Sequence, residues 1–176
     1  MTQNRFTVRK LTLTAVLMAM NIIMSLSMLS IPVPGGHMYL NDVIIVTAAV
    51  LLDPFCAFLV GGVGAFLGDL LAAYQVAMVV SLVTHGLQAV VVSLFTHRLF
   101  KNRPVAGSII GAALGIVIAV VGYTLGRAYV YSTPAYALAK LPFQILQDTA
   151  GSALGLLLCW KAGIVKLYEK QFGTKI

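Results

Sequence analysis

The 176-residue sequence has few charged side chains: they make up 10% of the chain, and only five of them are acidic. Soluble domains carry about 25% charged residues, and much of their surface must face water. Hydrophobic residues make up 60% of this chain, and its mean hydropathy is +0.95. A water-soluble globular domain is therefore excluded, and the composition indicates an integral membrane protein.

Motifs for energy use and catalysis are also missing. The chain has no Gly-x-x-x-x-Gly-Lys-Ser/Thr loop to bind phosphates, so it cannot power transport with ATP by itself. It has no His-x-x-x-His or Asp-x-x-Asp pair, which argues against a polytopic membrane enzyme, the competing class. The two cysteines, Cys56 and Cys159, lack metal-ligand spacing, so we expect no metal and no cofactor in this chain.

Six charge-poor apolar stretches predict an all-α integral membrane protein that forms a single transmembrane domain over residues 1–176. The stretches lie at about 11–29, 40–52, 55–73, 76–95, 105–128 and 141–160, with an outer loop at 30–39. Crossing the hydrocarbon takes about 20 helical residues, so the second stretch is short. No alternating barrel pattern is present, and an open sheet would leave unpaired edges in lipid.

Basic residues predict the orientation. Ten of the 12 Lys and Arg precede the first stretch, lie between the fourth and fifth, or follow the sixth. Only Arg127 and Lys140 fall on the opposite side. The positive-inside rule therefore places both termini in the cytoplasm. Six crossings are needed for this split, because with five the cations at 98–103 would lie outside.

Polar residues at membrane depth are costly, and with this topology most of them lie in the outer halves of the helices. Lys140, Gln144, Gln147 and Asp148 share one helical face, and His85 and Gln88 share another. We expect these stripes to line an outward-facing pocket for a small, mostly uncharged heterocycle. The predicted substrate-binding residues are His37, Tyr39, Asn41, Asp69, Thr84, His85, Gln88, Tyr123, Arg127, Lys140, Gln144, Gln147 and Asp148.

Structural roles remain open for many of these residues. Asp148 and Lys140 could form an ion pair, and His85 could make an interhelical hydrogen bond. Asn41 or Asp42 could cap a helix, and Arg127 could reach the headgroups. The tyrosines at 123, 129, 131 and 136 could form an aromatic belt at the interface.

The sequence resembles the substrate-binding (S) components of energy-coupling factor (ECF) vitamin importers along nearly its whole length. The similarity rests on Ala15-Val16-Leu17-Met18-Ala19, on Gly36-His37-Met38-Tyr39-Leu40-Asn41-Asp42, on the 61–69 stretch and on Leu141-Pro142-Phe143-Gln144 followed by Gln147-Asp148. These features are most similar to the hydroxymethylpyrimidine and pyridoxine branch. The riboflavin branch stays open, as does another vitamin such as pantothenate.

The resemblance implies a bacterial, multi-pass protein of the cell membrane that captures a vitamin outside the cell. It implies partners, namely a transmembrane coupling (T) subunit and two cytoplasmic ATPases that use the ATP. It also implies that Ala15 and Ala19 dock the coupling subunit and that the first outer loop closes over the vitamin. No nucleic-acid partner is expected, because the cations follow the membrane topology.

Overall fold

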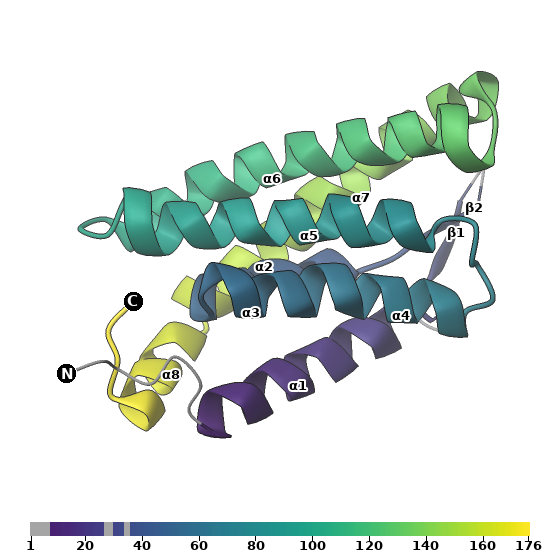
Figure 1. Cartoon of the computed structure of the whole chain (residues 1–176). Helices are drawn as coiled ribbons and strands as arrows, with labels where there is room; N and C mark the ends of the chain where they lie inside the picture. Colours follow the sequence, from purple (N-terminus) through teal and green to yellow (C-terminus); the bar gives the residue numbers. More distant parts are fainter. Residues whose placement is uncertain (1–7, 27–29, 34–35) are drawn as a thin grey trace.

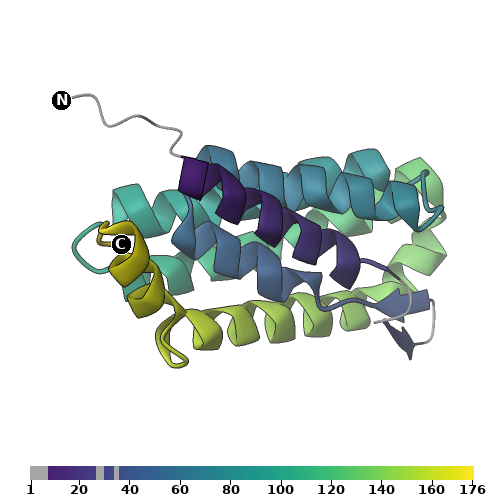
Figure 2. The same cartoon turned by 90° about the horizontal axis from the view of Figure 1, so that it is seen from below.

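A computed structural model describes residues 8–26, 30–33 and 36–176 as a bundle of helices that run side by side (Figures 1 and 2). Helix α1 spans Val8–Met24, and a hairpin of β1 (Ile31–Val33) and β2 (Gly36–Met38) follows it. Arg5, the end of the predicted 11–29 helix at 27–29, and loop residues 34–35 lie outside the described residues. The hairpin was not expected in an all-α chain; its strands pair antiparallel with Pro32 opposite His37.

Helix α2, at Asn41–Leu51, has 11 residues and lies at the centre of the bundle. At 1.5 Å per residue it is about 16 Å long, which is too short to cross about 30 Å of hydrocarbon by itself. Every residue in it except Val43 is buried. After the polar first turn at Asn41 and Asp42, the helix is apolar on nearly all sides, because neighbouring helices surround it.

The next helical run is continuous from Pro54 to Leu71 and consists of α3 (Pro54–Phe58), the π-helical turn η2 (Leu59–Val63) and α4 (Gly64–Leu71). Asp53 caps its start, since its Oδ1 accepts hydrogen bonds from the backbone N–H groups of Phe55 and Cys56. Gly61 and Gly62 let α5 (Met78–Leu94) approach closely: a Cβ at either glycine would lie 2.8 Å from a backbone oxygen of α5.

Helix α5 continues into η3 (Phe95–Leu99), and α6 (Pro104–Gly126) continues into η4 (Arg127–Tyr131). Helix α7 runs from Pro134 to Trp160, so it begins seven residues before the predicted start at 141. The Oγ1 of Thr133 accepts the N–H of Tyr136, and Pro134 suits the first helical position. Lys140 therefore lies inside the helix. The predicted helix began only after Lys140, because this charged residue interrupts an otherwise apolar pattern.

After Gly163, whose φ of +82° is accessible to glycine, the chain turns by 51° into α8 (Ile164–Phe172). This helix was not predicted. Its apolar residues include buried Val165, whereas Lys166 and Lys170 are exposed. A short amphipathic helix at an angle to the bundle is typical of the membrane interface.

Three helices in the described part of the chain are long and apolar enough to cross a membrane: Pro54–Leu71, Met78–Leu99 and Pro104–Tyr131. The bent pair α7 and α8 makes a fourth if it is counted as one span. Figure 1 shows α8 and the α5–α6 turn at one end of the bundle and the hairpin at the other. The arrangement is that of a multi-pass membrane bundle, while six crossings and cytoplasmic termini remain predictions.

Candidate functional site

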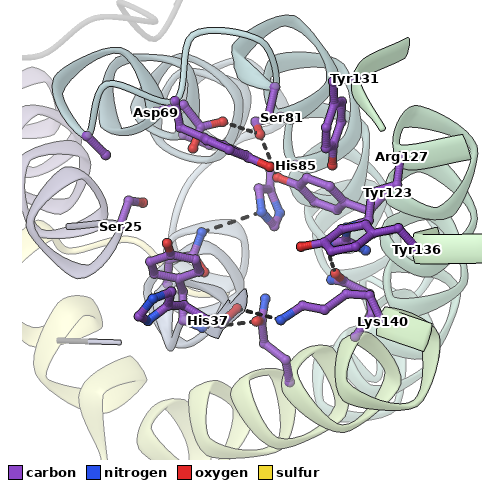
Figure 3. Close-up of a pocket in the computed structure, with 18 residues that line it drawn as sticks. Ser25, His37, Asp69, Ser81, His85, Tyr123, Arg127, Tyr131, Tyr136 and Lys140 are labelled. Carbon is purple, nitrogen blue, oxygen red and sulfur yellow. Dashed lines mark hydrogen bonds between the residues drawn. The ribbon is translucent and has the colours of Figure 1, made fainter. Parts of the chain in front are cut away.

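A cavity of about 270 Å³ lies at the hairpin end of the bundle. Figure 3 shows side chains from several helices and the hairpin around this one space. Ten of the thirteen predicted binding residues line it: His37, Tyr39, Asn41, Asp69, His85, Tyr123, Arg127, Lys140, Gln144 and Gln147. Residues distant in sequence thus meet at one end of the bundle, as their predicted common depth required.

The other three predicted residues lie behind the cavity. Gln88 is completely buried between His85 and Asp42, and Asp148 is completely buried below Gln144. Thr84 packs against α6, where a Cβ at Gly122 would lie 2.6 Å from its Oγ1. Each lies close to the cavity, but its side chain faces a neighbouring helix, which sequence spacing alone does not resolve.

Sequence analysis missed several residues that line the cavity. Ser81 lies on α5 one turn before His85, and Tyr131 and Tyr136 were considered for an aromatic belt, but none was predicted to bind substrate. The remaining missed residues are Ser25, Ala65, Ala72, Tyr74 and Ala77. Small apolar side chains leave room for a ligand without carrying a recognisable signal.

The hairpin is attached to α7 by two long-range hydrogen bonds. Lys140 Nζ donates to the backbone oxygen of His37 at 2.8 Å, and Tyr39 N donates to Gln147 Oε1 at 2.9 Å. A hydrogen bond of 2.8 Å also joins Ser30 Oγ to His37 Nδ1. Lys140 is only 3% exposed, and its hydrogen bond holds the hairpin over the cavity. The ion pair with Asp148 considered above is not among those that the described residues form.

The proton positions on His85 follow from its partners. Asn41 Nδ2 can only donate, so the His85 Nε2 atom 3.4 Å away accepts. His85 Nδ1–H then donates to Gln88 Oε1 at 2.7 Å, and Gln88 Nε2 donates to Asp42 Oδ1 at 2.8 Å. His85 is therefore neutral in this arrangement. Neither Asn41 nor Asp42 caps α2, because both lie within its first turn.

Arg127 forms the opposite wall. Its Nη2 donates to Gln144 Oε1 at 2.6 Å, and Gln144 Nε2 donates to Asp148 Oδ1 at 2.7 Å. The guanidinium also lies over the ring of Tyr123, with Cζ 5.3 Å from the ring centre. At 9% exposure, the side chain of Arg127 is buried within the bundle.

A third chain of hydrogen bonds joins α6, α5 and α4. Tyr123 OH donates to Ser81 Oγ at 2.8 Å, and Ser81 Oγ donates to Asp69 Oδ2 at 2.5 Å. The His85 ring meets Tyr123 edge to face at 5.1 Å between ring centres. These contacts hold an aromatic surface and a carboxylate in fixed positions beside the cavity.

Two lining tyrosines outside the spanning segments remain neutral phenols. Burial raises the pKa of Tyr39, and the negative charge of Asp69 raises it further. Burial also raises the pKa of Tyr74, with a further contribution from Tyr136. Both hydroxyl groups therefore keep their protons at neutral pH and can donate hydrogen bonds to a ligand.

Two polar atoms on lining residues have no hydrogen-bond partner within the described residues: Asn41 Oδ1, an acceptor, and Arg127 Nη1, a donor. Buried polar groups are nearly always paired, so these two atoms are exceptions. No group of three or more His, Cys, Asp or Glu in that same part of the chain could hold a metal ion. The cavity therefore offers hydrogen bonds of both polarities and aromatic rings.

Far from the cavity, the two predicted docking residues are exposed. Ala15 and Ala19 lie one turn apart on α1, next to exposed Val16 and Met20, whereas Leu17 faces the core. Their small side chains leave the helix backbone accessible to a partner helix. The structure places them on an uncovered face without testing their role.

Comparison with known proteins agrees with this architecture. Over 154 residues, 86% of each chain, the sequence is 29% identical to the thiamine precursor transporter HmpT of Lactococcus lactis subsp. cremoris (strain MG1363). The family model described as "ECF-type riboflavin transporter, S component" matches residues 5–164. This match covers most of the chain, and the protein therefore belongs to the family of ECF-type transporter S components.

Proposed function

We propose that this S component binds a thiamine precursor with a single pyrimidine ring, hydroxymethylpyrimidine, in the cavity at the hairpin end. The observation that carries the proposal is the size and lining of the cavity. At about 270 Å³ it lies just below the roughly 300–1,000 Å³ of pockets for drug-sized ligands. One aromatic ring with small substituents suits this space.

The polar groups match such a ring. Its ring nitrogens can accept a hydrogen bond from the hydroxyl of Tyr39 or Tyr74, and its amino or hydroxyl group can donate to Asp69, all of which line the cavity. The tyrosines supply faces and edges for stacking. The similarity to a thiamine precursor transporter supports the same substrate class.

Riboflavin is the second candidate, because the matching family model carries that description. Its three fused rings and polyol chain take more space than one pyrimidine ring, and the cavity of about 270 Å³ suits the smaller ligand better. Pyridoxine has one ring and fits the size argument as well as a pyrimidine does. Pantothenate lacks a ring, so the aromatic lining does not favour it.

Delivery into the cell requires partners. We propose that the chain crosses the bacterial cell membrane six times with both termini in the cytoplasm. In this orientation the cavity faces outward and the exposed Ala15–Ala19 face meets the T subunit, which couples to two ATPases. The absence of a phosphate-binding loop from the sequence supports this division of labour.

Calorimetry on the purified protein with a vitamin panel tests the substrate. We expect hydroxymethylpyrimidine to bind tightly without ATP, and riboflavin and pantothenate to bind weakly or not at all. Mass spectrometry of any co-purified ligand provides an independent identification. Tight riboflavin binding would overturn the size argument, and chemical conversion of the recovered ligand would indicate an enzyme instead.

A further inference from the structure

Behind the cavity, two carboxyl groups that the proposed function does not use meet in the protein interior. Asp42 on α2 and Asp148 on α7 are both 0% exposed. Gly151, one turn below Asp148, brings the two helices together, since a Cβ there would lie 2.5 Å from Asp42 Cβ. Asp42 therefore faces α7 about one turn from Asp148.

Hydrogen-bond donors converge on this pair from both walls of the cavity. From one wall the order of donation is Asn41, His85, Gln88 and then Asp42 Oδ1. From the other wall, Arg127 donates to Gln144, and Gln144 donates to Asp148 Oδ1. Each carboxyl group thus receives one donor on Oδ1.

The second oxygen of each group has none. Within the described residues, no donor completes a hydrogen bond to Oδ2 of Asp42 or Asp148. Gln147 also faces Asp42, and His85 Nδ1 lies 3.9 Å from Asp42 Oδ1, but His85 is neutral and donates to Gln88. Among the described residues, Arg127 is the cation that hydrogen bonds link to the pair, through Gln144.

We propose that Asp42 and Asp148 form a proton-binding site in which one proton is shared between the two Oδ2 atoms. The proton supplies the missing donor and completes a continuous hydrogen-bond chain between the two walls. It also leaves the pair with one negative charge, which the single positive charge of Arg127 balances. Two buried carboxylates without it would repel each other in a medium of low dielectric constant.

A proton fits this site better than a metal ion does. Metal ions such as Mg²⁺ and Ca²⁺ need six or more oxygen ligands. Among the described residues, no third His, Cys, Asp or Glu joins the pair to form a metal-binding group. A proton needs only the two oxygens already present. The site does not depend on which vitamin the cavity binds, so its test is separate from the substrate test.

Infrared spectroscopy of the full-length protein can detect the proton directly, because a protonated carboxyl group has a C=O band distinct from that of a carboxylate. The chain has only five acidic side chains, which makes the band assignable. We expect one such band at neutral pH that shifts in D₂O. Either Asp42→Asn or Asp148→Asn should abolish it, because the new amide donates to the remaining carboxylate and replaces the proton.

Asp69→Asn serves as the control and should leave the band in place, since Ser81 already donates to that carboxylate. A wild-type spectrum without the band, or a band that persists in both pair variants, would overturn the proposal. So would a requirement for sodium or another metal ion for wild-type stability, because an ion would then occupy the place of the proton.

Thermal unfolding across pH provides a second measurement. The folded protein holds a proton that the unfolded chain releases at neutral pH, so stability falls as the pH rises. We expect Asp148→Asn to lose this component of the pH dependence. Equal pH profiles for wild type and this variant would contradict the shared proton.

Discussion

Replacement of Gln144 by leucine tests the hydrogen-bond chain on the Arg127 wall. Gln144 is 1% exposed, accepts from Arg127 and donates to Asp148, so it joins two buried charged groups. Leucine has a similar volume but offers neither an acceptor nor a donor. In the variant, both terminal nitrogens of Arg127 lack an acceptor, because Nη1 already has none among the described residues.

The expected cost follows from two reference ranges. Interhelical hydrogen bonds in membrane proteins average about 0.6 kcal/mol and reach about 1.7 kcal/mol. Hydrogen bonds to charged groups contribute about 1.5–3 kcal/mol, and an unpaired buried group adds its own penalty. Both lost bonds involve a charge, so the higher range applies to each of them and we expect a loss of about 3–6 kcal/mol in the free energy of unfolding.

Equilibrium unfolding in detergent measures this loss, and calorimetry measures the ligand. The affinity for the ligand should fall tenfold or more if Arg127 is misplaced, because a loss of about 1.4 kcal/mol in binding free energy is a tenfold change in Kd. Leu146→Ala is the matched control: it alters the same helix at a side chain that is 57% exposed. The reasoning fails if Gln144→Leu is as stable as this control and binds ligand equally well.

Three further predictions concern other parts of the molecule. Ala15→Trp and Ala19→Trp should spare ligand binding but abolish uptake in cells, because a bulky side chain blocks close helix approach; undiminished uptake would refute the docking role. Gln147→Ala removes the acceptor for Tyr39 N, so stopped-flow measurements should show faster ligand release, and an unchanged rate would mean that the hairpin is held in another way. Gly151→Ala should lower the melting temperature, because overpacking against α2 costs about 1–3 kcal/mol while improved helix propensity returns only about 1 kcal/mol; an equal or higher melting temperature would show that α2 and α7 can separate at no cost.

The sequence indicated which helices carry the polar residues around the cavity better than it indicated the direction of each side chain. Hydropathy and helical spacing predicted that His85, Gln144 and Gln147 line a cavity, and all three do so in the structure. Gln88 and Asp148 share those stripes but point behind the cavity. A helical face spans a wide arc, so periodicity alone does not separate a side chain that faces a cavity from one that faces the adjacent helix.

Helix boundaries were less predictable where polar residues lie in the interior. Lys140 interrupts an apolar pattern and suggested a helix start, yet it is buried and donates to the His37 carbonyl from a hairpin over 100 positions away. The amphipathic α8 escaped prediction because it is short and does not cross the bundle. In each case the deciding contact is non-local.

Scarce charge, long apolar stretches and the grouping of basic residues were enough to indicate a helical membrane protein. They also predicted that most of the polar residues within the helices lie in the same half of the bundle. These features determine the free energy of transfer of each segment from water to lipid. That free energy is a sum over the residues of the segment, so it can be estimated from the sequence. The tertiary structure alone decided that α2 is enclosed by its neighbours and that Asp42 meets Asp148. Those outcomes depend on how closely helices approach at particular glycines, which is a property of pairs of segments rather than of any one of them.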